Sequence, residues 1–134
     1  RKDLSLKEIG NMARILNKNN LYWTAYFMFG LPSETKEDIE KTFALIEEID
    51  PQFVTMARYT PLPGSEMYES LVREGAINEN DSEWGQWSNQ WLGLGFTKGI
   101  GPNKFKETMA DIARRIDEHN SHRKPQKPNP LFRF

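Results

Sequence analysis

The chain has 134 residues, with 18 lysines and arginines against 19 aspartates and glutamates, and it contains no cysteine. A net charge of -1 gives no electrostatic reason to expect a nucleic acid as a partner. The lack of cysteine excludes disulfides, thiolate zinc sites and iron–sulfur clusters ligated by this chain alone. No apolar run is long enough to span a membrane and no signal peptide opens the chain, so we expect a cytoplasmic protein with one domain.

The first expected element is a helix that begins after Ser5. Ser5 and Glu8 have the spacing of a capping box, in which each side chain satisfies a free backbone N–H. The apolar residues behind the cap fall on one helical face: Leu6, Ile9, Ala13 and Leu16. Residues 21–29 follow, and their apolar and aromatic side chains alternate poorly. This pattern predicts a strand covered on both faces, as in a parallel sheet.

A strand, a Gly/Pro loop and a capped helix then occur twice. Thr35 and Asp38 predict the cap of a helix over residues 36–49, whose inward face is Ile39, Phe43, Ile46 and Ile49. Residues 53–59 predict the next strand. Ser65 is expected to cap a third helix, which is closed by Gly75 and has as its inward residues Met67, Leu71 and Val72. This order is typical of a parallel α/β fold.

The rest of the chain is less regular. Residues 78–101 are rich in Asn, Gly and Trp and receive no assignment, and a last helix is expected from about residue 103, with an inward face of Phe105, Met109, Ile112 and Ile116. From residue 121 the sequence is basic and Pro-rich, as in an extended tail. We therefore divide the chain into residues 1–77, 78–120 and 121–134.

Two strands do not close a sheet. A right-handed crossover through residues 36–49 would place the strands side by side in parallel, or on either side of one common neighbour. At least one strand edge would then lie open. We expect the chain to self-associate through that edge or to cover it with residues 87–97. The missing strands would come from another part of a longer chain or from a second copy.

Two loops carry a family resemblance. Gly30-Leu31-Pro32-Ser33-Glu34-Thr35, after the first strand, resembles the fifth-strand motif of radical S-adenosylmethionine enzymes, especially the branch with an upstream cobalamin-binding domain. Thr60-Pro61-Leu62-Pro63-Gly64-Ser65-Glu66 resembles the loop after the sixth strand in that branch. The order and spacing agree over residues 4–77. One departure is Ser33, where the family often has glycine.

The resemblance implies the C-terminal portion of a partial (β/α)6 barrel. The family uses S-adenosylmethionine and a 4Fe–4S cluster, held by a CxxxCxxC loop after the first strand, to generate a 5′-deoxyadenosyl radical; this branch is also compatible with cobalamin in the parent. The cysteine loop and the first four strands are absent from this sequence. We therefore expect a part of such an enzyme that is not catalytic alone. Its partners would be the remainder of its barrel and a small-molecule substrate of unknown identity.

The resemblance also implies a site at the strand ends. Met28, Phe29 and Gly30 match the stretch that lies along the adenine of S-adenosylmethionine, and the other side of that pocket is matched by Tyr59, Thr60 and Pro61. The same chain segment would contribute part of the substrate wall. No residue is expected to be catalytic or to bind a metal.

Several residues allow a second interpretation. Both loops could be simple turns, and Glu34 and Glu66 could either stabilise helix starts or act as acid and base in a small complete enzyme. Arg58 could point into a barrel or lie at a sheet edge. Trp84, Trp87 and Trp91 fall at helical spacing, and we interpret them as an aromatic cluster that covers the barrel end or its open edge rather than as a wall against substrate or cofactor. His119 and His122 are interpreted as solvated rather than as a metal-binding pair. The alternative for the whole chain is a self-contained α/β binding or interaction module without redox chemistry.

Overall fold

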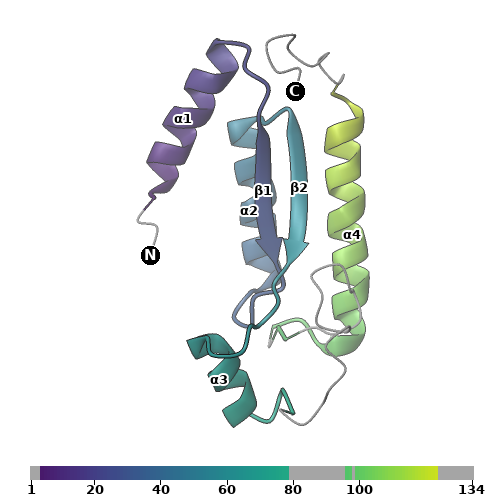
Figure 1. Cartoon of the computed structure of the whole chain (residues 1–134). Coiled ribbons are helices and arrows are strands. Elements are labelled where there is room, and N and C mark those ends of the chain that lie inside the picture. The colour runs from purple at the N-terminus through teal and green to yellow at the C-terminus, as the bar shows by residue number, and fades with distance from the viewer. Residues whose placement is uncertain (1–3, 79–95, 98, 124–134) are drawn as a thin grey trace, which may run out of the picture.

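The structure, a computed structural model, describes residues 4–78, 96, 97 and 99–123. Figure 1 shows a pair of strands with helices behind and beside them. The elements are, in chain order, α1 (Leu6–Lys18), β1 (Thr24–Phe29), α2 (Lys36–Ile49), β2 (Phe53–Arg58), α3 (Glu66–Arg73) and α4 (Pro102–Ser121). No helix within these ranges combines the length and apolar character that a membrane crossing needs.

The two strands pair in parallel. Their register runs from Thr24 opposite Phe53 to Phe29 opposite Arg58. The chain crosses from one strand to the other through α2, which begins at the Thr35 cap and ends at Asp50 in a left-handed conformation. The predicted strand–helix–strand unit is therefore confirmed, including the bounds of its crossover helix. Among the described residues the sheet has only these two strands.

Helices α2 and α4 cover one face of the sheet, with α2 behind the strands and α4 along β2, and α3 lies beyond the strand ends (Figure 1). The main core joins both strands to α2 and α4 through buried residues that include Phe29, Ile46, Val54, Phe105 and Met109. The predicted inward faces of α2 and α4 are confirmed, since all their residues are buried. On α1, Ala13 packs against Ala25 and Ile49 in a smaller cluster.

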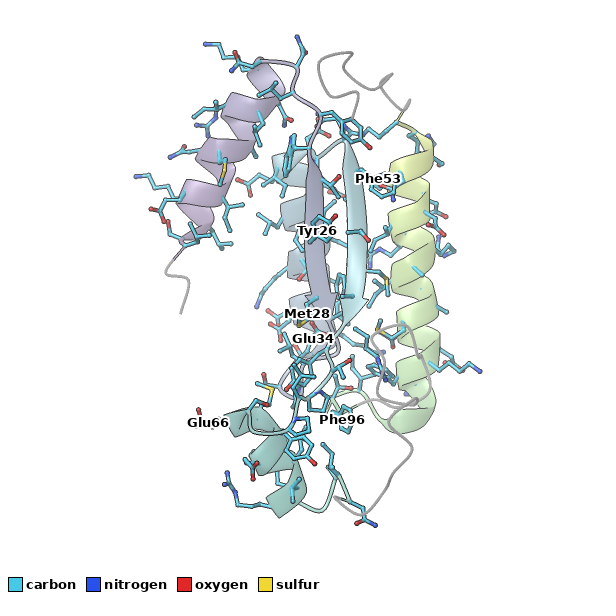
Figure 2. All side chains as sticks on the ribbon, viewed as in Figure 1. Tyr26, Met28, Glu34, Phe53, Glu66 and Phe96 are labelled. Atoms are coloured by element: carbon cyan, nitrogen blue, oxygen red, sulfur yellow. The ribbon has the colours of Figure 1, made fainter. Side chains whose placement is uncertain are left out.

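The opposite face of the sheet carries exposed side chains. Tyr26 is 82% exposed and Met28 is 53% exposed, and Phe53 is exposed beside them on β2 (Figure 2). The prediction that the first strand is covered on both faces is therefore wrong for the part of the chain that the structure describes. Poor alternation in the sequence arose because aromatic and apolar residues occupy both faces, whether covered or not.

The outer edge of β2 is capped by a side chain of α4. Asn120 Oδ1 accepts from the Val54 N–H at 2.9 Å, and Asn120 Nδ2 donates to the Val54 carbonyl at 2.9 Å. Next to it, His119 Nε2 lies 3.0 Å from the Pro51 carbonyl oxygen, so the expectation of a solvated His119 is wrong. The end of α4 is thereby fixed to the start of β2. Residues 87–95, expected as a possible edge cover, lie outside the described residues.

Two predicted inward residues face solvent instead. Leu6 is 68% exposed, and the buried residue of α1 is Ala13. Met67 is also exposed, and the next residue of α3, Tyr68, lies in the core instead. Leu71 is buried and Val72 packs against the same cluster, as expected. The predicted tryptophan cluster of residues 84–91 and the tail beyond residue 123 lie outside the described residues.

Candidate functional site

The two Gly/Pro loops meet at the carboxyl ends of the strands. The Tyr59 N–H donates to the Phe29 carbonyl at 2.7 Å, which extends the parallel ladder by one bond beyond β2. This bond joins the residues that directly precede the two loops. The structure therefore brings the predicted site residues of both strands to one end of the sheet, where Figure 2 shows Met28 and Glu34. In parallel α/β folds this end of the sheet is where ligands bind.

The predicted residues at the end of β1 differ in what they can offer. Met28 lies on the open face, where its thioether is available to a flat ring. Phe29 is 0% exposed and stacks on Phe43 of α2, with ring centroids 6.0 Å apart. Its side chain therefore belongs to the core, and only its backbone can contribute to a site at the strand end.

Gly30 is buried in a left-handed turn with φ +87°. A Cβ added here would lie 3.2 Å from the ring of Phe105 and 3.5 Å from Cγ of Arg58. The glycine is thus required both by the turn and by the close packing of α4. On that side Gly30 meets protein atoms, so a ligand ring would have to approach from the other side.

Arg58 lies on the helix-covered face and is 2% exposed, rather than pointing into a lumen or lying at the surface of an edge. Burial lowers the pKa of its guanidinium. Both alternatives that the sequence left open for this residue are wrong.

Glu34 has a role that sequence reasoning missed. Its side chain is 8% exposed, and Oε2 accepts from the Gly30 N–H at 2.7 Å. Burial raises the pKa of the Glu34 carboxyl, against the opposing effect of that hydrogen bond. Glu34 precedes the cap residue Thr35, whose capping-box partner is Asp38. One signal was present: Asp38 already completes the cap, which leaves Glu34 available to turn back into the loop.

The loop after β2 contains a buried polar side-chain atom, the hydroxyl of Thr60. Thr60 Oγ1 is buried and has no hydrogen-bond partner among the described residues. Tyr59 is half-buried, which raises the pKa of its phenol, and the Pro61 side chain is fully buried. A buried hydroxyl normally has a hydrogen-bond partner, so an orphaned one marks a position that water or a ligand can satisfy.

The open face of the sheet is uncharged. By strand alternation and register, it carries the side chains of Thr24, Tyr26, Met28, Phe53, Thr55 and Ala57. Apolar and hydroxyl groups of this kind suit contact with an apolar molecule or with a further protein layer, and they offer no counter-ion to a charged one. The face ends at the strand-end loops.

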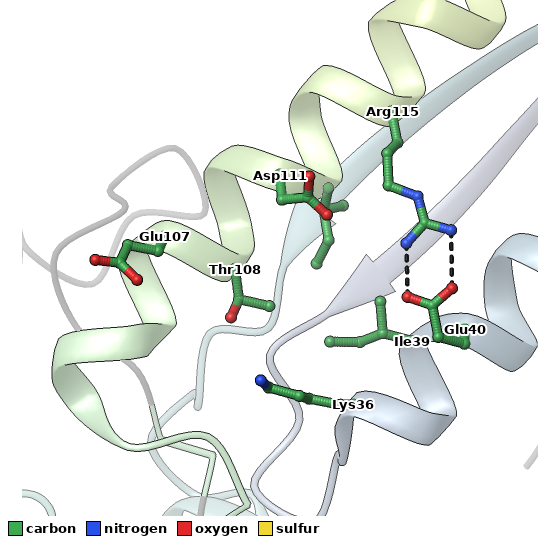
Figure 3. Close-up of a pocket in the computed structure, with 8 residues that line it drawn as sticks. Lys36, Ile39, Glu40, Glu107, Thr108, Asp111 and Arg115 are labelled. Atoms are coloured by element: carbon green, nitrogen blue, oxygen red, sulfur yellow. Dashed lines mark hydrogen bonds and ion pairs between the residues drawn. The ribbon is translucent and has the colours of Figure 1, made fainter.

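A separate cavity of about 310 Å³ lies between α2 and α4 (Figure 3). Arg115 spans it, with its nitrogens 2.7 and 2.9 Å from the two carboxylate oxygens of Glu40 and its guanidinium 3.5 Å from the ring centroid of Phe43. These contacts clamp the two helices together on the covered side of the sheet. Within the described ranges, no cluster of three or more His, Cys, Asp or Glu residues could hold a metal ion.

Comparison with known proteins gives similarity to enzymes over part of the chain. The chain is 29% identical, over 70 residues, to the anaerobic magnesium-protoporphyrin IX monomethyl ester cyclases of Rubrivivax gelatinosus and Cereibacter sphaeroides. The match covers 52% of this chain but only 13% and 11% of the two cyclases. No protein-family model and no solved structure matches the chain. This similarity agrees with the resemblance of the two loops to radical S-adenosylmethionine enzymes.

Proposed function

We propose that the chain is the C-terminal part of a radical S-adenosylmethionine barrel. The loops after β1 and β2 would form the adenine side of the cosubstrate site, and the uncharged open face would form part of the substrate wall. The observation that carries this proposal is the parallel β1–α2–β2 unit, whose two Gly/Pro loops meet at one end through the Phe29–Tyr59 hydrogen bond. The similarity to the two cyclases supports the same assignment.

The strand-end residues fit the adenine group. Adenine presents hydrogen-bond donors and acceptors at its edges and a flat apolar face. Thr60 Oγ1 is a buried hydroxyl that has no partner among the described residues, and Met28 offers an exposed thioether next to the strand end. We propose that Thr60 hydrogen-bonds the adenine edge, that Met28 packs against the ring and that the buried Pro61 helps to exclude water. When bound, S-adenosylmethionine would supply the 5′-deoxyadenosyl radical.

The metal centre must be held elsewhere. The chain contains no cysteine, so its residues do not fit a 4Fe–4S cluster, and no step is assigned to such a cluster here. We propose that the cluster, and cobalamin if the parent uses it, bind to the remainder of the enzyme. That remainder would be the principal partner of this chain, in a cytoplasmic enzyme. The uncharged open face fits an apolar part of a small-molecule substrate better than a charged part.

The test compares the full-length protein with the 134-residue chain. After anaerobic reconstitution and reduction, we expect the full-length protein to bind iron and to release 5′-deoxyadenosine from S-adenosylmethionine. The isolated chain should do neither. Failure of the full-length protein to cleave S-adenosylmethionine, together with ligand or protein binding by the isolated chain, would instead support a self-contained binding module.

A matched pair of variants tests the site. In the full-length protein, Thr60→Val should weaken S-adenosylmethionine binding about tenfold, the effect of losing about 1.4 kcal/mol. Thr42→Val is the control, because Thr42 Oγ1 donates to the Asp38 carbonyl within α2, away from the strand end. Equal affinities of the two variants would remove Thr60 from the site.

A further inference from the structure

The segment that leads into α4 lies against the loop after β1. This lead segment comprises residues 96, 97 and 99–101. A Cβ added at Gly99 would lie 3.0 Å from the Glu34 carbonyl oxygen and 3.6 Å from Cα of Thr35. The backbone of the lead segment therefore passes directly against the end of the loop, just before α2 begins.

The glycine at this contact is not explained by its backbone conformation. Among the described residues the glycines with positive φ are Gly30, Gly64 and Gly75, and Gly99 does not belong to them. A glycine without that need is unfavourable, because it loses more conformational freedom on folding than any other residue. What requires glycine here is the close approach of two backbones, a contact that buries no apolar side chain. The contact therefore fixes the position of the loop and adds nothing to the core.

The lead segment also holds the helix that follows the second loop. Phe96 packs against the cluster of α3 that contains Tyr68 and Leu71, beyond the strand ends (Figure 2). The start of α3 is tied in turn to the loop after β2, since Ser65 Oγ donates to the Leu62 carbonyl at 2.7 Å. One short segment thus contacts the first loop directly and the second loop through α3.

The lead segment is itself anchored. Ile100 is buried in the main core, and the buried Thr97 donates through Oγ1 to the Ile100 carbonyl at 3.0 Å. At the start of α4 the Phe105 N–H donates to the Gly101 carbonyl at 3.0 Å, and the Phe105 ring fills the space beside Gly30. Because these contacts leave the segment little freedom, its position determines where both of its neighbours lie.

We propose that the lead segment sets the spacing of the two strand-end loops, with Gly99 and Phe96 as positioning residues for the candidate site. At their base the loops are joined by the hydrogen bond between Tyr59 and Phe29. The lead segment supplies a second connection, farther along the loops. Two connections hold open a gap of constant width for a flat ring such as adenine, and neither positioning residue touches that ring. This inference rests on the proposed function.

The first experiment uses two glycines of the lead segment in the full-length protein. Affinities for S-adenosylmethionine, and for adenosine as a probe of the adenine side, are measured well below the thermal midpoint of each variant. Gly99→Ala should weaken both affinities by at least about tenfold, because its Cβ meets backbone that cannot turn away. Gly101→Ala is the control and should stay within about twofold. A Cβ at Gly101 would meet no atom of the described residues within 4 Å, and its φ of -56° is open to alanine.

A second pair of variants tests the other end of the lead segment. Phe96→Ala should weaken both affinities about fivefold, whereas Phe96→Leu should restore them to within about twofold of the wild type, because leucine still fills the contact with α3. Hydrogen exchange of the peptide that covers residues 30–35 gives a readout that does not depend on ligand. Exchange should accelerate in Gly99→Ala and stay unchanged in Gly101→Ala.

The outcomes separate this inference from the proposed function. If the wild type binds neither probe, the proposed function fails and the positioning role fails with it. If the wild type binds and Gly99→Ala binds both probes equally well, only the positioning role is overturned. Equal losses in Gly99→Ala and Gly101→Ala, or a loss for S-adenosylmethionine without one for adenosine, would overturn it as well. Should Gly99→Ala not fold, the two Phe96 variants decide by the same criteria.

Discussion

The two strand–loop–helix units are built from the same residue types but reach different states. Gly30 and Gly64 both have positive φ, at +87° and +82°. A Cβ at Gly30 would meet the Phe105 ring, whereas one at Gly64 would meet no atom of the described residues within 4 Å. Glu34 is buried and bonded within its loop, whereas Glu66 is exposed. The difference teaches that a local sequence pattern sets the turn and the cap, and that the element packed over the loop decides its rigidity.

The largest expected difference concerns the helices of the two units. Ile46 of α2 belongs to the core that joins both strands to α4, whereas Leu71 of α3 lies in a separate cluster with Tyr68 and Ile77. Ile46→Ala should lower the free energy of unfolding by about 4 kcal/mol. Leu71→Ala should lower it by about 2 kcal/mol, the lower end of the range for a buried leucine, with lost amide protection confined to α3. Equal shifts of the urea midpoint would show that the two units unfold as one.

The next largest expected difference is between substitutions of Gly30 and Gly64. Gly64→Ala should cost about 1 kcal/mol of unfolding free energy, the strain of a left-handed conformation. Gly30→Ala should cost about 3 kcal/mol, because the contact with Phe105 adds overpacking to the same strain. Urea denaturation of both variants measures the difference. A Phe105→Leu background should reduce the cost of Gly30→Ala, and additive effects in that double variant would argue against the contact.

Two threonines should respond with opposite signs. Thr35→Val removes a helix cap and its capping box, so it should lower the free energy of unfolding by about 1 kcal/mol. Thr60→Val removes a buried hydroxyl without a partner among the described residues, so it should leave stability unchanged or raise it by up to about 1 kcal/mol. Thermal midpoints of the isolated chain report both. A clear loss of stability in Thr60→Val would reveal a hydrogen bond that the hydroxyl makes in the folded chain.

The smallest expected effect is a pH dependence. The pKa of Glu34 is raised by burial above its ordinary value of 4.5, so the folded state holds the proton more tightly than the unfolded state. Its contribution to stability is therefore present below that value and is lost as the pH rises through the folded pKa. Relative to Glu34→Gln, which does not titrate, the wild type should lose stability over this range. Urea midpoints measured from acid to neutral pH test this, and a relative gain would contradict the direction.

The sequence predicted what local signals determine. Thr35 and Asp38 indicated the start of α2, and the spacing from Phe105 to Ile116 indicated the inward face of α4. The sequence did not predict contacts between residues that lie far apart along the chain. Asn120 bonds Val54 across 66 residues, and nothing in the local sequence of either residue indicates that pairing. The burial of Glu34 was missed for a related reason, because it depends on the chain that leads into α4 passing over the loop.

The position of the candidate site in the fold was predictable from the sequence. The position of the two Gly/Pro loops followed from the strand–helix–strand order, since parallel strands end at the same side. The direction of individual side chains did not follow, because one residue of phase decides which face a side chain occupies. Phe29 therefore points into the core, although the next position back, Met28, is exposed.

The side chain of Asn120 acts as a one-residue substitute for a third strand. It occupies the donor and the acceptor that Val54 would otherwise offer to an incoming chain. The outer edge of β2 is therefore closed at Val54, where an incoming strand would otherwise pair. A shorter version of the protein that stops before residue 120 would lose this closure. Such a truncation should promote edge-to-edge aggregation, which makes residue 120 the practical lower limit when the chain is shortened for expression.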